Sequence, residues 1–173
     1  MKILIAVDDM SFADALVDFI IHCELSKDSE FRILHVVEPL FAADFAVGFS
    51  AEQRESLKEE RHRLGRCIVM HIDTQLRLKF PQAVITETVV DGLAKSSIVE
   101  HANNWGADLI VMGSHGRGSV ERLFLGSVSL AVLAQAPCSV ATVRLPRLTS
   151  KIKPAEAENS DTKNSVQSAQ LRI

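Results

Sequence analysis

Five short apolar runs alternate with stretches of helical character, and this alternation constrains the fold more than any other feature of the chain. The runs are the expected strands, at residues 2–7, 31–37, 84–90, 109–112 and Ser139–Val143. Apolar strands that alternate with helices form a mainly parallel sheet covered on both faces, and right-handed crossovers restrict the strand order. The expected fold is therefore α/β, a doubly wound five-stranded parallel sheet of order 3-2-1-4-5.

Helix-start signals lie between these runs. Ser11 stands three residues before Asp14, a spacing that resembles a capping box, and Ser50 with Gln53 makes a second such pair. The first pair predicts a helix that begins near Ser11, and the second predicts a long charged helix that ends near Lys79. Two shorter helices are expected, at residues 96–104 and 128–135.

The expected strand order reverses direction between the first and the fourth strand. In open α/β sheets, ligands bind outside the carboxyl ends of the strands at such a reversal. Asp8 follows the first strand directly, and Gly113 follows the fourth. The fold alone therefore marks Asp8 and Gly113 as candidate ligand contacts.

The length of 173 residues favours one domain over two. Residues 1–146 contain all of the expected strands and helices, and we expect them to form that domain. Residues 147–173 are rich in Lys, Ser, Asn, Gln, Glu and Ala, a composition that buries too little apolar surface to offset ordering entropy. We expect this segment to be a disordered tail, with a short helix that docks on a partner as the alternative.

Charge and composition exclude several classes of function. The net charge is −3, whereas nucleic-acid-binding domains usually carry a basic face, so no nucleic-acid partner is expected. No apolar stretch approaches the ~20 residues of a membrane span, and the apolar start is too short for a signal peptide, so no membrane association is expected. The three cysteines are too widely spaced for a metal site or a disulfide framework, which favours a reducing, cytoplasmic location.

The segment 113–128 is rich in glycine and nearly fits two phosphate-binding motifs. Gly113 and Gly118 have the spacing of a P-loop, but Ser119 stands where that motif requires Lys. Gly116 could open a dinucleotide fingerprint, but Glu121 occupies its third glycine position. These mismatches disfavour a P-loop phosphotransferase and a dehydrogenase.

The physical chemistry of this segment still favours an anion. Glycines can adopt positive φ and let a ligand approach the backbone closely. Gly126 and Ser127 directly precede an expected helix, whose first N–H groups attract anions, and the Ser127 hydroxyl could cap that helix or bond a phosphate. The alternative is a plain connecting loop whose glycines serve only turns.

The spacing Gly113, two residues, Gly116, nine residues, Gly126-Ser127 resembles the Gly-x2-Gly-x9-Gly-Ser signature of ATP-binding universal stress proteins. The runs 3–8, 34–36 and 136–140 also resemble that family, and the resemblance covers residues 1–144. It implies an adenine-nucleotide alpha-hydrolase-like (HUP-type), Rossmann-like fold, and ATP or AMP as ligand, with Mg²⁺ beside a triphosphate.

The resemblance also implies which residues contact the nucleotide. Asp8 would contact the adenosine and Val36 the adenine, while Met112 and Gly113 would border the ribose and phosphates. The implied phosphate contacts are Gly116, Gly126, Ser127 and Val128. This chain departs from the family directly after Asp8, where many members have Gly-Ser and this sequence has Asp9-Met10-Ser11. A second carboxylate there could weaken affinity or alter ribose contacts.

Three further features carry open alternatives. A group of cations on the long helix is interleaved with glutamates and is interpreted as a solvated helix face; its members are Arg54, Lys58, Arg61, Arg63 and Arg66. The long loop 40–50 holds three phenylalanines that could cover the site, bind a partner or pack on the sheet edge. His115 and Arg117 could bond phosphate, but His115 lacks the positioned partner that a general base requires.

The favoured function is a stress-response regulator or adaptor that binds an adenine nucleotide and responds through dimerisation or partner binding. The expected homodimer pairs the edge strand Ser139–Val143 with its copy, a contact that the resemblance also implies. No catalytic residue is identified. The alternatives are a slow ATPase or phosphotransferase and a structural dimer that binds no nucleotide.

Overall fold

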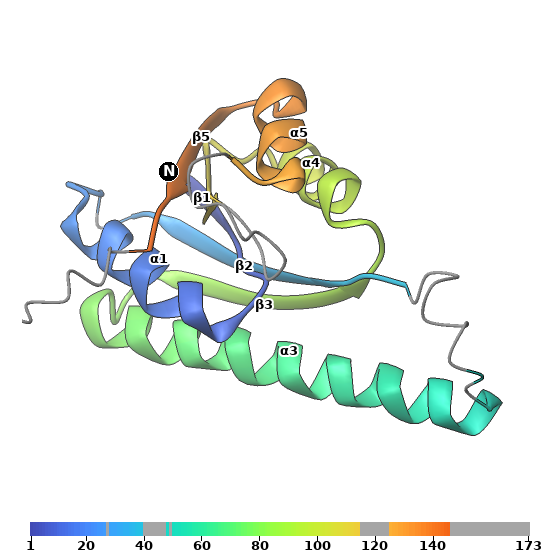
Figure 1. Cartoon of the computed structure of the whole chain (residues 1–173). Coiled ribbons are helices and arrows are strands. Elements are labelled where there is room, and N and C mark those ends of the chain that lie inside the picture. The colour runs from blue at the N-terminus through green and yellow to red at the C-terminus, as the bar shows by residue number, and fades with distance from the viewer. Residues whose placement is uncertain (27, 40–47, 49, 115–124, 146–173) are drawn as a thin grey trace, which may run out of the picture.

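The computed structural model describes residues 1–26, 28–39, 48, 50–114 and 125–145 of the chain (Figure 1). Within these ranges five strands form one sheet: β1 (Lys2–Ala6), β2 (Glu30–Val37), β3 (Val84–Asp91), β4 (Leu109–Gly113) and β5 (Ser139–Val143). The helices of the same ranges are α1 (Met10–His22), α3 (Ala51–Lys79), α4 (Ala94–Trp105) and α5 (Ser127–Gln135).

The strand order is β3-β2-β1-β4-β5 and every neighbouring pair is parallel, which confirms the predicted fold. At the carboxyl end of β1, Ala6 pairs with Leu34 of β2 on one side and with Met112 of β4 on the other. The order in which the strands are added to the sheet therefore reverses direction at β1, and the carboxyl ends of β1 and β4 lie side by side.

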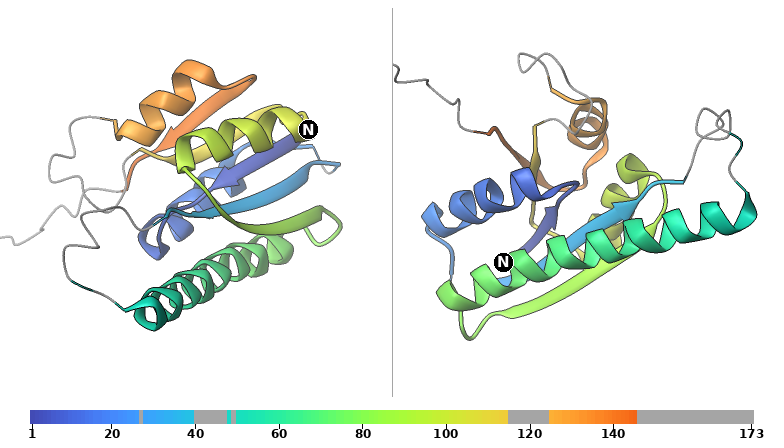
Figure 2. Two further views of the ribbon diagram at one scale, coloured as in Figure 1. Left: turned by 90° about the vertical axis from the view of Figure 1, so that its right-hand side faces the viewer. Right: turned by 60° about the horizontal axis from the view of Figure 1, so that its bottom comes forward.

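Two hydrophobic cores cover the two faces of the sheet, with α1 and α3 on one face and α4 and α5 on the other (Figures 1 and 2). Alternate residues of β1 divide between them: Ile3 and Ile5 contact the first core, whereas Leu4 and Ala6 contact the second. Full burial of such aliphatic side chains contributes about 1.5–3 kcal/mol each, which is why a strand buried on both faces is apolar throughout.

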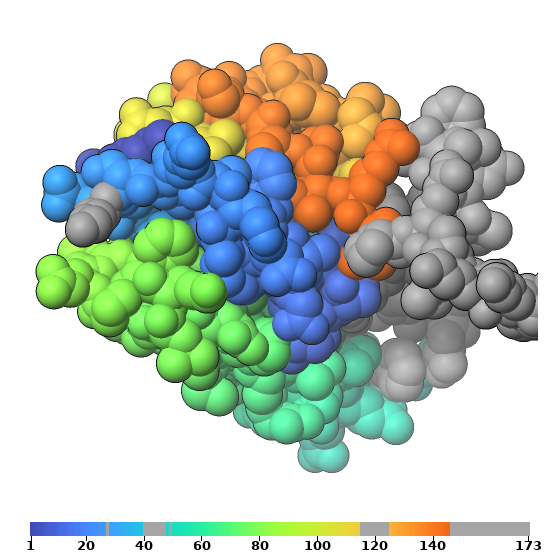
Figure 3. All heavy atoms as spheres, turned by 90° about the vertical axis from the view of Figure 1, so that its left-hand side faces the viewer, coloured from blue at the N-terminus to red at the C-terminus, as the bar shows by residue number. Residues whose placement is uncertain are grey.

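Helix α1 closes the surface between α3 and β5. Figure 3 shows α1 in blue between the teal-to-green α3 and the orange β5, in agreement with the contacts between these elements. Its buried face consists of Phe12, Ala13, Leu16, Val17 and Ile20. This apolar stripe packs against β1 and the carboxyl-terminal half of α3.

The capping box predicted from Ser11 and Asp14 is wrong. Helix α1 begins at Met10, and Asp9 is its N-cap, with Asp9 Oδ1 accepting from Ser11 N at 2.8 Å and from the Ser11 hydroxyl. Asp9 caps the helix in place of Ser11 because its short carboxylate reaches the N–H groups of the first turn directly. Asp14 instead accepts from His71 Nε2 of α3 at 2.8 Å.

The second capping box is confirmed, because Ser50 and Gln53 bond each other's backbone N–H groups at the start of α3. The 29 residues of α3 span about 43 Å, whereas the eight residues of β3 span about 26 Å. The first buried residue of the helix is Gly65. The amino-terminal half of α3 therefore extends past the sheet, as Figure 1 shows.

The other two helices agree with the predictions to within two residues at each end. Helix α4 ends at Gly106, whose φ of 69° is the left-handed conformation that favours glycine. No helix in the described ranges is long and apolar enough to cross a membrane. Most of the predicted loop 40–50 and the whole tail 147–173 lie outside the described residues, so the domain boundary near residue 146 stays a prediction.

Gly65 allows α3 to approach the buried His35 of β2. A Cβ atom at position 65 would lie 2.5 Å from His35 Cδ2, well inside contact distance. His35 is only 5% exposed, and its Nδ1 lies 3.0 Å from the carbonyl oxygen of Val7 at the end of β1. The absence of a side chain at position 65 therefore lets His35 of β2 contact α3 while it also bonds Val7, the residue directly after β1.

We expect Gly65→Val to lower the free energy of unfolding by about 1–3 kcal/mol, because overpacking displaces neighbouring side chains. Helix propensity favours Val over Gly by only about 0.4 kcal/mol and does not offset this cost. Urea denaturation measures the change, with the exposed neighbour substitution Arg66→Ala as a control that stays within about 0.5 kcal/mol of wild type. Equal or greater stability of Gly65→Val would contradict the contact with His35.

Candidate functional site

A cavity of about 470 Å³ opens where the carboxyl ends of β1 and β4 meet. This reversal of the strand order is the switch point of the sheet. The ends of β1, β2 and β4 and the first turns of α1, α4 and α5 all contribute residues to the cavity. The described lining residues are Ala6, Val7, Asp8, Phe12, Leu34, Val36, Glu38, Ala94, Ile98, Met112, Gly113, Leu125, Gly126, Ser127, Val128 and Ser129. The position agrees with the crevice that the strand order predicts.

Seven of the eight predicted nucleotide contacts line this one cavity. They come from four places in the chain: Asp8 after β1, Val36 in β2, Met112 and Gly113 in β4, and Gly126, Ser127 and Val128 at the start of α5. The eighth, Gly116, lies outside the described residues, as do His115 and Arg117. The fold therefore brings together residues that are far apart in the sequence.

Hydrogen bonds hold the two ends of the glycine-rich segment against each other. Gly126 N donates to Ser114 O at 2.8 Å, and the Ser129 hydroxyl donates to Gly113 O at 2.9 Å. Ser114 N in turn donates to Val143 O of β5 at 2.8 Å. These bonds place the end of β4 beside the start of α5, so both ends of the segment border the same cavity.

Gly113 acts by close approach rather than by a left-handed backbone. Among the described residues, positive φ occurs only at Gly48 and Gly106, so neither Gly113 nor Gly126 uses the positive φ that glycine permits. A Cβ atom at Gly113 would lie 2.9 Å from the ring of Phe12. Gly113 is thus required by the packing of α1 against β4, next to the cavity.

The amino terminus of α5 supplies the positive electrostatic potential of the site. Gly126 is the N-cap, with φ −63° and ψ 157°, and provides no side-chain cap. The Ser127 hydroxyl therefore does not cap the helix, since Ser127 is its first residue and is exposed. Unpaired N–H groups and the helix dipole at such a terminus attract an anion.

The two adjacent aspartates have different surroundings. Asp8 is exposed and lines the cavity, whereas Asp9 caps α1. The expectation of Asp9 as a second carboxylate at the nucleotide mouth is therefore not met. The departure from the family sequence at this point supplies a helix cap, and the cavity keeps Asp8.

Several lining residues were not predicted, and Glu38 is the most informative. Its Oε1 accepts from Ala94 N at 3.0 Å and so caps the first turn of α4, where Leu93 provides no side-chain cap. The position of Glu38 directly after β2, at the same sheet edge as Asp8, is a signal that could have identified it. Ala94 and Ile98 had no such signal, because the packing of α4 decides which of its faces meets the cavity.

A divalent cation would depend on the ligand for most of its coordination. The described residues contain no group of three or more His, Cys, Asp or Glu side chains that could hold a metal ion. Mg²⁺ commonly keeps several waters and binds one or two carboxylates together with phosphate oxygens. Asp8 is the exposed carboxylate at the cavity that suits such a role.

Solved structures with the same fold include nucleotide complexes. The structure of the hypothetical protein MJ0577 has a TM-score of 0.71 at 25% identity, covering 84% of this chain and 96% of that one. A universal stress protein in complex with cAMP has a TM-score of 0.60 at 21% identity, covering 84% and 98%. An Arabidopsis thaliana family member with AMP bound has a TM-score of 0.60 at 17% identity, covering 90% and 98%. At identities below 25% the likeness shows the fold alone.

Sequence comparison gives the family directly. Universal stress protein A homolog 2 of Coxiella burnetii is 34% identical over 147 residues, covering 83% of this chain and 94% of that protein. The model of the universal stress protein family matches residues 1–144, which span every described strand and helix. The chain therefore belongs to the universal stress protein family.

Proposed function

We propose that this protein binds an adenine nucleotide, ATP foremost, in the cavity at the switch point and acts as a stress-response regulator or adaptor. The observation that carries the proposal is the convergence of seven predicted contacts, from four separate places in the chain, on one cavity. The volume of about 470 Å³ lies within the range of roughly 300–1,000 Å³ typical of small-molecule sites. The nucleotide complexes of proteins with the same fold support it.

The two ends of the cavity suit the two ends of a nucleotide. Val36, Ala94 and Ile98 offer apolar surface for the base. The start of α5 offers N–H donors and a positive dipole for phosphates. Asp8 lies at the exposed mouth between β1 and β4, where its carboxylate can accept hydrogen bonds from ribose hydroxyls.

The lining favours binding over chemistry. Its described titratable side chains are Asp8 and Glu38, and Glu38 already caps α4. Hydrolysis needs a base positioned on an attacking water, and a carboxylate that is committed to a helix cap is poorly placed for that role. We therefore propose that occupancy of the site, rather than turnover, is the regulatory event.

Isothermal calorimetry with ATP and AMP tests the proposal directly. We expect saturable heat with either nucleotide and competition between the two. Purified protein that gives no heat with ATP or AMP, while its unfolding remains cooperative, would remove the proposed function.

Substitution of Gly126 separates binding from folding. Since the backbone at this N-cap suits any residue, Gly126→Asp and Gly126→Asn should both keep or slightly raise stability, by roughly a few tenths of a kcal/mol. Gly126→Asp places a negative charge against the phosphates and should weaken AMP binding at least about 100-fold, because like charges at close range cost several kcal/mol.

Gly126→Asn is the matched control for this charge effect, because it has nearly the same shape and caps helices equally well. Calorimetry should show a much smaller loss for Asn than for Asp, with thermal unfolding checking both folds. Equal losses for the two variants would mean that shape, and not anion binding, decides the effect at position 126.

The aspartate pair gives a second comparison. We expect Asp8→Ala to weaken AMP binding roughly tenfold, the cost of losing a hydrogen bond to a charged group, with little change in stability. Asp9→Ala should instead lower the free energy of unfolding by about 1 kcal/mol, because it removes the cap of α1, and should leave affinity within about twofold. Calorimetry measures the AMP affinity of both variants, and urea denaturation measures their free energies of unfolding. A loss of affinity in Asp9→Ala together with a loss of stability in Asp8→Ala would contradict the assigned roles.

We further propose that the protein forms a homodimer through β5. Among the described strands, β5 pairs only with β4, so its other edge is available to a second copy. Pairing two such edges across a two-fold axis satisfies both. Sedimentation equilibrium at micromolar concentration should give twice the mass of the chain, and ATP should change the dissociation constant. A monomer with and without ATP would contradict this assembly.

A further inference from the structure

A second cavity, of about 490 Å³, lies between the amino-terminal half of α3, which extends past the sheet, and the carboxyl ends of β2 and β3. Six of its nine described lining residues are ionisable, in contrast to the mainly apolar described lining of the first cavity. The lining residues are Val37, Glu38, Pro39, Arg54, Glu55, Lys58, Arg61, Asp91 and Gly92. None of the described residues of the glycine-rich segment lines it, and among the described residues it shares Glu38 alone with the first cavity.

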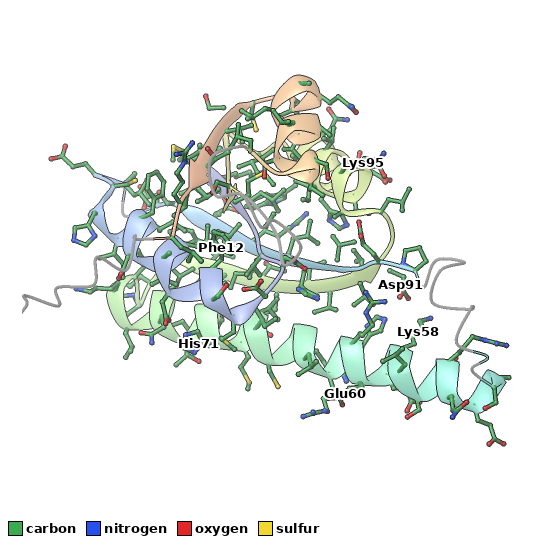
Figure 4. All side chains as sticks on the ribbon, viewed as in Figure 1. Phe12, Lys58, Glu60, His71, Asp91 and Lys95 are labelled. Carbon is green, nitrogen blue, oxygen red and sulfur yellow. The ribbon has the colours of Figure 1, made fainter. Side chains whose placement is uncertain are left out.

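The structure divides the cations of α3 into two groups. Arg54, Lys58 and Arg61 follow the spacing of one helix face and line the cavity. Arg63 instead bonds Glu60 at 2.6 and 2.7 Å on the exposed side of the helix, and Arg66 is exposed outside the cavity. Figure 4 shows Lys58 extending toward Asp91 while Glu60 points away from the sheet. Arg54 and Arg61 are partly buried, so the prediction of a solvated face is wrong for these two. Lys58 is exposed and agrees with that prediction although it lines the cavity.

The negative charge of Asp91 is matched within the cavity. Its Oδ1 accepts from His62 Nε2 at 2.9 Å, and its Oδ2 lies 3.3 Å from Lys58 Nζ. These bonds, from His62 first and then Lys58, lower the pKa of Asp91 and keep it ionised. The charges of Asp91 and Lys58 therefore offset each other at the cavity.

Arg61 carries a positive charge that no carboxylate of the described residues matches. Its side chain is partly buried, and Nη1 donates to the backbone oxygen of Glu38 at 3.0 Å. In the part of the chain that the structure describes, no carboxylate lies within 4.0 Å of it, since none of the salt bridges found there includes Arg61. The Glu38 carboxylate is directed to Ala94 N, where the positive end of α4 offsets its charge.

The geometry points to a second ligand site in which Arg61 and Arg54 bind a small oxyanionic molecule, a phosphate ester or a carboxylic acid. Guanidinium groups present planar pairs of N–H donors that match the oxygens of phosphate and carboxylate. The partly buried position of Arg61 strengthens such a bond relative to one in water. Glu55 also lines the cavity and favours a ligand of low total charge, because a highly charged anion would meet its carboxylate.

Amide NMR spectra of the full ¹⁵N-labelled chain, titrated with inorganic phosphate, test this site. The Gly92 amide, bonded to Val37 O at 3.1 Å, reports the second cavity, and the Gly126 amide reports the first. We expect a saturable shift at Gly92 that sodium chloride at equal ionic strength does not reproduce. A titration with malonate distinguishes the two ligand sources, since a carboxylate site saturates with malonate and a phosphate site with phosphate.

Variants of the lining arginines test whether the anion that shifts the Gly92 amide binds in the second cavity. Arg61→Gln and Arg54→Gln should each raise the apparent dissociation constant of the saturating anion at least about tenfold, the loss expected for a charged hydrogen bond. Arg63→Gln, on the same helix but outside the cavity, should leave it within about twofold. Peak dispersion confirms that each variant is folded, and Arg54→Gln carries the test if removal of the Arg61 bond to Glu38 perturbs the fold.

Three results would overturn the site: no saturable shift at Gly92 with either anion, an equal shift with chloride, or an equal loss of affinity in Arg63→Gln. Each is independent of nucleotide binding, because the Gly126 amide is read in the same spectra. Phosphate could move the Gly126 amide alone, in which case the anion site belongs to the first cavity and the second site is excluded.

Discussion

The parallel pairing of β1 with both β2 and β4 is the constraint on which the rest of the structure depends. Because the chain leaves β1 once toward β2 and later returns beside it as β4, the crossover helices cover opposite faces of the sheet. The carboxyl ends of β1 and β4 then lie side by side, and the cavity opens there. The apolar sequence of β1, buried on both faces, is what makes this central position stable.

Close approach at two glycines connects this framework to the cavity. Gly65 lets α3 contact His35, which holds the end of β1 through Val7, and Gly113 lets Phe12 of α1 pack against β4. Both contacts lie on the α1 and α3 face, whereas the part of the cavity proposed to receive the base lies on the α4 and α5 face. The α1 and α3 face of the sheet is therefore tightly packed on the side of the cavity that faces away from α4 and α5.

Much of the fold and part of the site could be predicted from the sequence. Strand order follows from the alternation of apolar runs, and Asp8, Gly113 and Gly126 follow from their places after strands and before a helix. The cap at Asp9 was missed because two neighbouring side chains, Asp9 and Ser11, both suit helix starts, and only the packing of α1 decides between them. The division of the α3 cations was missed because helix periodicity gives spacing but not the direction in which a face points.

The hydrogen bonds that join Gly113 and Ser114 to the start of α5 have a consequence for how this family can diversify. All of their donors and acceptors lie outside residues 115–124, so the two rims of the cavity are fastened before that stretch begins and after it ends. Substitutions between these bonds leave their donors and acceptors in place, so both rims of the cavity can be kept while the sequence that joins them varies among family members.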